Sequence, residues 1–137
     1  MWASLFGTRE VVRIDPATNT VVARITVGTQ PCGITAAAGA VWVGNYTGDS
    51  VVRIDPRTNR RAATIPVGRS PGDGGIVRGQ LWVPNVMDST LSRIDPRTNA
   101  VVETVEVGSG PFVVPNHPSE IWVGSWTGSD VWRLAPR

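Results

Sequence analysis

The chain has 137 residues, of which 41% are hydrophobic, enough for one domain with an ordinary core. All 13 basic residues are arginines spread along the chain, and the formal net charge is only +2. Lysine Schiff-base chemistry is therefore excluded, and no nucleic-acid partner is expected. The single cysteine, Cys32, excludes an intrachain disulfide and a cysteine-based zinc site. Residues 1–10 lack the features of a signal peptide and no stretch reaches transmembrane length, so we expect a soluble protein without a membrane partner.

A decapeptide that recurs every forty residues divides the chain. Its copies begin at Val11, Val51 and Leu91, and a shortened copy begins at Val131. A fixed period of this length is typical of repeat architectures. The single segment 1–137 therefore divides into a half-repeat 1–10, repeats 11–50, 51–90 and 91–130, and a partial repeat 131–137.

Each decapeptide predicts the end of a strand followed by a tight turn. In the copy VVRIDPRTNR, the first four residues are mostly β-branched and favour a strand. Pro56 fixes φ at the first central position of the turn, and the carboxylate of Asp55 accepts backbone N–H bonds. Asn59 tolerates the left-handed conformation that releases the chain into the next strand.

Three more strands follow the decapeptide in each repeat. The second strand ends at a glycine, which is Gly28, Gly68 or Gly108. A short third strand and a tryptophan-bearing fourth strand come next. The expected third strands are Gly33-Ile-Thr-Ala, Gly75-Ile-Val and Phe112-Val-Val, and the expected fourth strands are Ala40-Val-Trp-Val-Gly, Gln80-Leu-Trp-Val-Pro and Glu120-Ile-Trp-Val-Gly.

Four short strands per forty residues, with one tryptophan at a fixed place, are typical of a β-propeller blade. Blades are buried on both faces, which explains strands that are nearly continuous apolar runs. We therefore predict an all-β propeller of about 3.5 four-stranded blades, with fourteen antiparallel strands and no helix longer than a turn. A β-sandwich is the alternative, but it gives no reason for three gapless copies.

The succession RIDPxTN, xVG, P and VWVGN resembles the YVTN-type bacterial β-propeller repeat over essentially the whole chain. The blades also resemble, more distantly, those of virginiamycin B lyase and its relatives. The shared motif is structural and carries no catalytic residue across. The resemblance implies that Gly33-Ile-Thr-Ala and its equivalents are innermost, followed outward by the tryptophan strand, the RID strand and the TVxVG strand.

One arginine recurs in the middle of the RID strand of every repeat. A ring of arginines is able to bind an anion, but we favour a structural role in which each stem stacks on a tryptophan and each guanidinium pairs with a carboxylate. The tryptophans are expected to be largely buried between blades. The residues concerned are Arg13, Arg53, Arg93 and Arg133, and Trp42, Trp82 and Trp122.

No catalytic residue, metal ligand or cofactor is predicted. His117 is the only histidine, and its place in a proline-rich stretch between two strands favours a turn residue. Cys32 is expected to be an unpaired thiol without catalytic duty. A lyase like that for virginiamycin B would need a base and a divalent metal held by several side chains, and no such spaced cluster is present.

Five residues are candidates for ligand binding. Asp73 lies near the expected propeller axis, where a carboxylate suits a ligand or a metal, but three neighbouring glycines favour a solvated, mobile loop. The others lie on the loops between tryptophan and RID strands. There Tyr46, Val86 and Trp126 share one repeat position, and Phe6 precedes them. These aromatics either form a recognition surface or cover the ends of blades. The five candidates are Tyr46, Asn45, Asp73, Asn85 and Trp126.

The sequence leaves two functions open. The first is a non-catalytic binding or scaffold propeller that recognises a protein, peptide or small ligand on its loop face, and the lack of histidine and carboxylate clusters favours it. The second is a metal-dependent lyase or hydrolase of the virginiamycin B lyase-like type with a site at the axis. Divalent metal that shifts the melting temperature would favour the second.

The strand count also predicts self-assembly. With strands lettered a to d from the axis outward, the chain consists of bcd, abcd, abcd and abc. Closed propellers need about four to eight blades, and an open arc would expose the apolar faces of both terminal blades. We therefore expect a homodimer that closes a ring of eight blade positions about a two-fold axis, since this is the commonest symmetry of homo-oligomers. The alternative is a fragment of a longer natural propeller, which should be prone to aggregation on its own.

Overall fold

A computed structural model describes residues 1–135, which form fourteen strands and no helix. In this part of the chain no helix is long and apolar enough to span a membrane. The strands are β1 (Trp2–Leu5), β2 (Glu10–Asp15), β3 (Thr20–Thr26), β4 (Pro31–Ala37), β5 (Ala40–Asn45), β6 (Ser50–Asp55), β7 (Arg60–Pro66), β8 (Gly75–Val77), β9 (Gln80–Asn85), β10 (Thr90–Asp95), β11 (Ala100–Glu106), β12 (Pro111–Val113), β13 (Ile121–Ser125) and β14 (Val131–Leu134). The expected fourteen strands are confirmed; residues 136–137 of the expected partial repeat lie outside the described residues.

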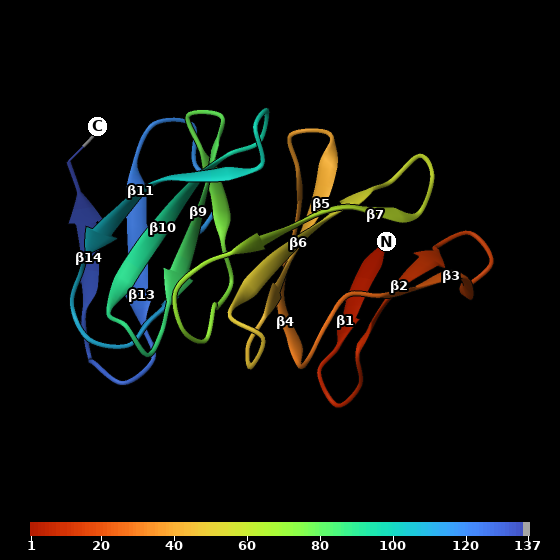
Figure 1. Cartoon of the computed structure of the whole chain (residues 1–137), viewed down its shortest axis with the longest axis horizontal. Helices are drawn as coiled ribbons and strands as arrows, with labels where there is room; N and C mark the ends of the chain where they lie inside the picture. Colours follow the sequence, from red (N-terminus) through yellow and green to blue (C-terminus); the bar gives the residue numbers. More distant parts are fainter. Residues whose placement is uncertain (136–137) are drawn as a thin grey trace.

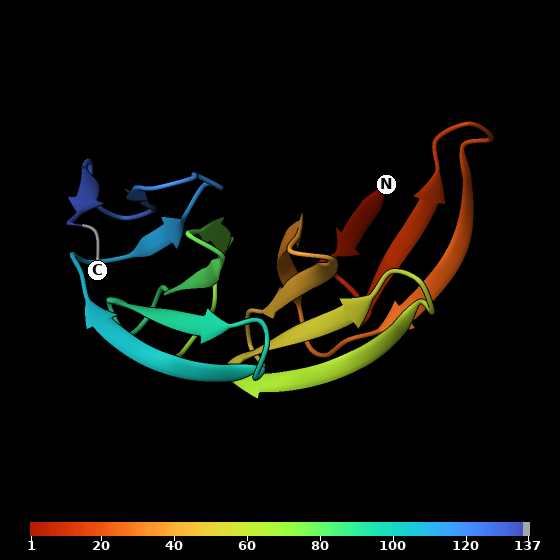
Figure 2. The same ribbon diagram turned by 90° about the horizontal axis from the view of Figure 1, so that it is seen from above.

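The strands form four antiparallel sheets, each made of consecutive strands. We call them blade I (β1-β2-β3), blade II (β4-β5-β6-β7), blade III (β8-β9-β10-β11) and blade IV (β12-β13-β14). The blades stand side by side along an arc (Figure 1), and β7 and β11 lie on its convex side (Figure 2). This arrangement confirms the expected propeller architecture and the expected order of strands within a blade.

The corner of each decapeptide folds as its residues predict. The carboxylate of Asp55 accepts a hydrogen bond of 2.8 Å from the backbone N–H of Arg57. Asn59 adopts φ of 56°, in the left-handed region, where the chain turns into β7. Asp15 and Asp95 accept the equivalent bonds, at 2.9 Å each. The RID strands β2, β6 and β10 also carry a register shift just after their arginine, which increases the local twist.

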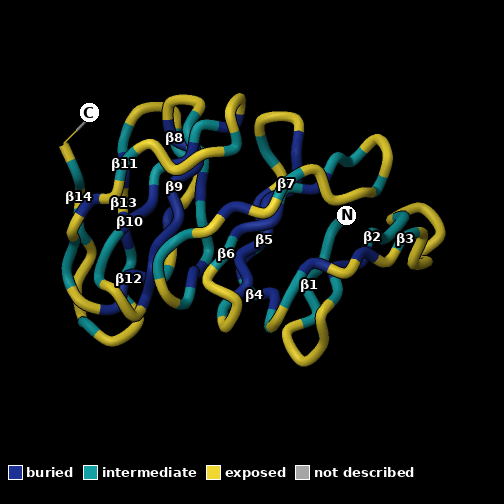
Figure 3. Tube along the Cα trace, in the orientation of Figure 1, coloured by how far each residue is buried: buried dark blue, intermediate teal, exposed yellow. Residues whose placement is uncertain are grey.

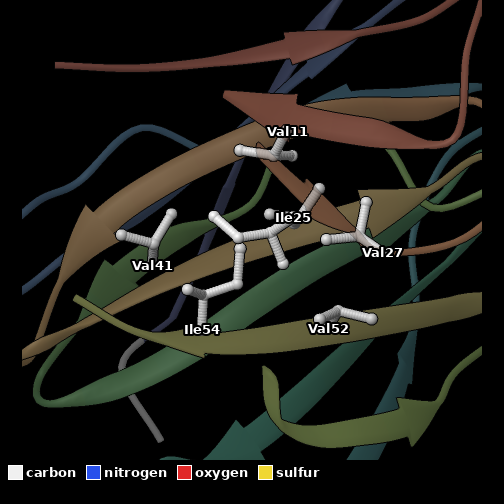
Figure 4. Close-up of a cluster of buried hydrophobic side chains, with 7 residues drawn as sticks. Val11, Ile25, Val27, Val41, Val52 and Ile54 are labelled. Atoms are coloured by element: carbon white, nitrogen blue, oxygen red, sulfur yellow. The ribbon is translucent and has the colours of Figure 1, made fainter. Parts of the chain in front are cut away.

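The hydrophobic core lies between the blades and not at a single centre. Each of three buried clusters combines side chains from two consecutive blades. Figure 4 shows the first, in which Val11 and Ile25 of blade I meet Val41 and Ile54 of blade II. The middle strands are accordingly buried, whereas the outer hairpin loops are exposed (Figure 3). Apolar burial between repeats therefore holds the arc together, as in other repeat architectures.

A polar contact between consecutive blades accompanies this packing, and we call it the arginine latch. Each repeated arginine lies over the tryptophan ring of its own blade, 5.3 to 5.8 Å from the ring centroid. In blades I and II, Nη1 of this arginine also donates to a proline carbonyl and an asparagine side chain at the corner of the next blade. The latch bonds run from Arg13 to Pro56 O (2.7 Å) and Asn59 Oδ1 (2.8 Å), and from Arg53 to Pro96 O (2.8 Å) and Asn99 Oδ1 (2.9 Å).

The expected burial of the tryptophans is correct for two of the three. Trp42 packs on blade III and Trp82, only 3% exposed, packs on blade IV. For Trp122 the expectation is wrong, because its side chain is 37% exposed. The reason is geometric: each tryptophan faces the blade that follows its own, and Trp122 lies in the last blade of the arc.

Candidate functional site

The candidate site is built from the loops that join the tryptophan strand to the RID strand in each blade. These loops lie along the lower rim of the arc in Figure 1. They place one side chain per blade, at the same repeat position, around a single cavity of about 310 Å³. Two residues at the beginnings of innermost strands complete its wall. The lining residues are Phe6, Tyr46, Val86 and Trp126 from the loops, and Cys32 and Phe112 from β4 and β12.

Two aromatic pairs form part of this wall. The rings of Phe6 and Tyr46 have centroids 6.4 Å apart and are tilted by 55°. The rings of Phe112 and Trp126 have centroids 4.6 Å apart and are tilted by 49°. Trp126 is 70% exposed, so much of its surface remains available to a ligand. The cavity thus offers π-faces and apolar surface, which suit an aromatic or aliphatic group.

Backbone hydrogen bonds fix the loops that carry these side chains. In blades II, III and IV the N–H of the lining residue donates to a carbonyl in the connection that leads into the innermost strand. Each acceptor residue has positive φ, which turns its carbonyl toward the loop. The bonds are Tyr46 N–H to Gln30 O (3.0 Å), Val86 N–H to Ser70 O (3.1 Å) and Trp126 N–H to Gly110 O (2.7 Å). The site therefore sits on a preorganised scaffold.

Asn45 and Asn85, which the sequence suggested as ligand contacts, lie beneath the loops and are buried. Nδ2 of Asn45 donates to the carbonyl of Val27 and to Oγ of Ser50, both at 3.2 Å. Nδ2 of Asn85 donates to the hydroxyls of Thr90 and Ser92 at 2.9 Å. These bonds tie the end of the tryptophan strand to its surroundings, so the structure gives both asparagines a role in supporting the loops.

Asp73 is not the freely solvated loop residue that its glycine neighbours suggested. Its N–H donates to the carbonyl of Phe112 at 2.8 Å, and its carbonyl accepts from the N–H of Val114 at 2.9 Å. A Cβ on Gly33 would lie 2.5 Å from the Cα of Asp73, so only glycine allows the innermost strands of blades II and III to approach this closely. Burial raises the pKa of Asp73, although a hydrogen bond from the backbone of Ile34 opposes the rise.

The thiol of Cys32 lines the cavity in a neutral state at physiological pH. Burial is the main cause that raises its pKa, and the negative charge of Asp73 raises it further. A raised pKa lowers the fraction of thiolate, which is the nucleophilic form. The cavity wall at Cys32 is thus weakly polar and suits apolar contacts.

His117 takes the place of a turn residue, as expected. Its Nδ1 accepts hydrogen bonds from the backbone N–H groups of Glu120 (2.9 Å) and Ser119 (3.3 Å). It lines a more open cavity of about 420 Å³ with Arg78 and Asn116, at the turns between innermost and tryptophan strands. Among residues 1–135, no three His, Cys, Asp or Glu side chains gather into a group suited to hold a metal ion.

Of the five residues suggested by the sequence, the structure brings Tyr46 and Trp126 together in the cavity wall. Cys32 and Phe112 also line it, although neither was among the five candidates. Their equivalent position in the repeat was a usable signal, because it lies at the beginning of the innermost strand, next to the loops.

No protein-family model matches the sequence, and the search of curated proteins found no match. Solved structures do match the fold. Streptogramin B lyase aligns with a TM-score of 0.85 at 20% identity, over 98% of this chain and 47% of that one. A catalytically inactive virginiamycin B lyase from Staphylococcus aureus, with quinupristin, aligns at 0.82 and 16% identity, over 98% and 48%. Hydrazine synthase from Kuenenia stuttgartiensis aligns at 0.80 and 22% identity, over 91% and 38%.

The chain thus spans less than half the length of each of these structures. At identities of 16 to 22% the likeness establishes the fold and leaves the activity open. The YVTN-type repeat remains a resemblance of sequence motifs. What the sheets and the structural likeness together establish is that this chain forms an arc of β-propeller blades.

Proposed function

We propose that the chain is a β-propeller binding module that takes an apolar, ring-bearing group of a protein, peptide or small ligand into the loop-face cavity. One observation carries the proposal: all four blades contribute a side chain from the same repeat position to one cavity. A cavity of about 310 Å³ is close to the lower end of the range for ligand pockets and fits an aromatic side chain or a small ring system.

The chemistry of the wall favours an uncharged group. Two aromatic pairs line the cavity, and the neutral thiol of Cys32 lines it as well. Asp73 raises the pKa of this thiol but is absent from the cavity wall. Desolvating a charge against the aromatic wall would cost free energy, whereas an aromatic ring gains from burial and from ring contacts.

The proposal is tested with three small probes observed by saturation-transfer NMR: N-acetyl-L-tryptophanamide, N-acetyl-L-phenylalaninamide and N-acetyl-L-glutamine amide. The two aromatic amides should receive magnetisation and the glutamine amide should not. Trp126→Ala and Tyr46→Ala should weaken binding of the tryptophan amide about tenfold or more, as expected for aromatic anchors. Met87→Ala is the matched control, because Met87 is exposed on the same kind of loop and does not line the cavity. Equal signals from Trp126→Ala and the wild type would contradict the proposal.

The proposal includes completion of the propeller ring by a second copy of the chain. The four blades follow an arc whose two ends turn toward the same side, as the halves of a ring would (Figure 2). A dimer has a mass of about 29 kDa, twice the 14.6 kDa of one chain. Size-exclusion chromatography with light scattering distinguishes it from a monomer.

A second candidate function is a metal-dependent lyase or hydrolase with a site at the propeller axis. Its support is the structural likeness to streptogramin B lyase and virginiamycin B lyase. In this chain Asp73 is the carboxylate beside the innermost strands of blades II and III. A rise in melting temperature with magnesium chloride, reversed by a chelator, would favour this function over the binding module.

A further inference from the structure

The junctions of blade I with blade II and of blade II with blade III each have a donor side and an acceptor side. On the donor side, a tryptophan, its stacked arginine and an aliphatic residue of the RID strand face the next blade. In the junction of blades II and III these residues are Trp42, Arg53 and Val51. On the acceptor side, an apolar pair receives the tryptophan, and the corner of the decapeptide receives the guanidinium. The same pairing occurs between blades I and II.

Blade IV carries a donor side that meets no blade among residues 1–135. Arg133 lies over the ring of Trp122, 5.8 Å from its centroid, as in the other three blades. Val131 is 65% exposed, whereas Leu91, at the equivalent position of blade III, is fully buried. We call Trp122, Val131 and Arg133 the C-terminal face. Apolar residues that are buried at equivalent junctions are thus presented together to solvent.

Blade I carries the matching acceptor side. Met1 pairs with Ile14 through two backbone bonds of 2.8 and 2.9 Å, as Val41 pairs with Ile54 in blade II. Met1 is 68% exposed, whereas Val41 is buried against blade I. Asn19 has φ of 52°, close to the 56° and 54° of the two asparagines that accept latch bonds. We call Met1, Ile14, Pro16 and Asn19 the N-terminal face.

We infer that the C-terminal face of one copy docks on the N-terminal face of a second copy, and that Arg133 donates to the partner's Pro16 carbonyl and the partner's Asn19 Oδ1. The inference rests on the ring completion proposed above and specifies its chemistry. The occupant is a second copy because this chain itself presents the acceptor side, in the backbone conformation that accepts the latch at two internal junctions.

The ion pair that Arg133 makes within its own blade is compatible with docking. Arg133 donates to Oε1 of Glu120 through Nη2, whereas both internal latches use Nη1. Nη1 is therefore the donor that the docked arrangement uses. Glu120 continues to hold the guanidinium over Trp122, because Glu120 also accepts a hydrogen bond of 3.0 Å from Nε1 of Trp122. The arginine is thus positioned before the partner arrives, which lowers the entropy lost on docking.

Two such junctions close a ring about a two-fold axis, because each copy uses both of its faces once. The junction is head-to-tail, so a defect on one face is complemented by a matching change on the other. Arg133→Glu places a carboxylate against the acceptors of the partner's corner, and Asn19→Lys places an ammonium against Arg133. In a mixed dimer of these variants, one junction pairs Glu with Lys and the other is wild type.

Light scattering on a size-exclusion column tests the inference with four samples. The wild type should have a mass of about 29 kDa. The mass of each single variant should shift toward 14.6 kDa, because its dimer dissociation constant is at least tenfold higher. An equimolar mixture of the variants should return to about 29 kDa. Arg57→Glu, at a corner position with an 88% exposed side chain, is the charge-matched control and should leave the mass unchanged.

Circular dichroism of each variant establishes that it is folded. If the lysine variant is unfolded, Asn19→Gly, which keeps the left-handed backbone and removes the acceptor, replaces it as the single variant whose mass is measured. A monomeric wild type would overturn the ring completion and this inference together. A dimeric wild type whose mass neither single variant changes would overturn this inference alone. Two monomeric variants that do not combine would exclude the head-to-tail arrangement.

Discussion

Arg53 and Trp42 form a pair that belongs to two blades at once. The guanidinium carbon of Arg53 lies 5.3 Å from the centroid of the Trp42 ring on the adjacent strand of blade II. The same guanidinium donates to the corner of blade III, while the tryptophan packs into the core between those blades. Each forty-residue repeat therefore carries the residues that contact the next blade as well as those that form its own strands. This explains why arginine and tryptophan recur together.

Arg53→Ala should lower the free energy of unfolding by roughly 2 to 3 kcal/mol, because it removes two charge-assisted hydrogen bonds and a cation–π contact. Urea denaturation followed by tryptophan fluorescence measures the change. Arg57→Ala is the control: its 3.8 Å ion pair with Asp55 is exposed, so the variant should lie within about 0.5 kcal/mol of the wild type. Equal effects of the two substitutions would show that the latch contributes nothing.

The sequence predicts the strands and their order because every repeat carries the same local signals. Asp55, Pro56 and Asn59 specify a corner through their own backbone and side-chain preferences, with no knowledge of neighbours. Trp122 shows where such reasoning ends. The segment around it, Glu-Ile-Trp-Val-Gly, follows the same pattern as the Gln-Leu-Trp-Val-Pro around Trp82, but its exposure depends on the next blade, which no local signal describes.

The candidate site was predictable in part for the same reason. A shared repeat position places Tyr46 and Trp126 on one rim, so their proximity follows from the period. Asn45 directly precedes Tyr46, and only the three-dimensional path of the strand decides that its side chain points down into the blade. Asp73 was misjudged because the glycines beside it serve close approach between innermost strands.

Trp82→Ala should cost roughly 3 to 5 kcal/mol of unfolding free energy, typical of truncating a buried aromatic side chain. Trp122→Ala removes the equivalent side chain from an exposed face and should cost clearly less in the isolated monomer. Thermal or chemical denaturation at low protein concentration measures both. A cost under about 1 kcal/mol for Trp82→Ala would mean that this ring contributes little to the junction of blades III and IV.

Cys32 should react slowly with iodoacetamide at pH 7, since burial and then the charge of Asp73 raise the pKa of the thiol. Asp73→Asn removes the second cause, so it should lower the pKa and speed alkylation at fixed pH. Mass spectrometry of timed samples gives both rates. Cys32→Ser should leave folding intact, and an unchanged rate in Asp73→Asn would show that the carboxylate does not act on the thiol.

Asp73 itself should make stability depend on pH. Its folded pKa is raised above the ordinary value of 3.8, so the folded state binds the proton more tightly than the unfolded state. The free energy of unfolding therefore falls as pH rises from about 4 through the folded pKa. Asp73→Asn, which keeps an acceptor for the Ile34 N–H, should be more stable than the wild type at pH 7. This advantage should vanish below about pH 4, and denaturation at both pH values checks it.

Gly68→Ala should destabilise the fold by about 1 to 3 kcal/mol through overpacking. A Cβ at this position would lie 2.6 Å from Cγ and 2.8 Å from Cβ of Asn85, a fully buried residue that cannot move aside without losing its bonds to Thr90 and Ser92. Gly7→Ala is the control, because a Cβ there would meet nothing within 4 Å, and its effect should stay within about 0.5 kcal/mol.

The double variant Gly68→Ala with Asn85→Ala separates steric conflict from a backbone effect. Asn85→Ala removes the amide, including Cγ at 2.6 Å and Nδ2 at 2.8 Å from the added methyl group, but leaves Cβ, which is also at 2.8 Å. The combined loss of unfolding free energy should therefore be smaller than the sum of the two single losses, since the single variants act on one contact. Chemical denaturation of all four proteins gives the coupling free energy. Strict additivity would mean that the glycine is required for its backbone and not for the space that Asn85 occupies.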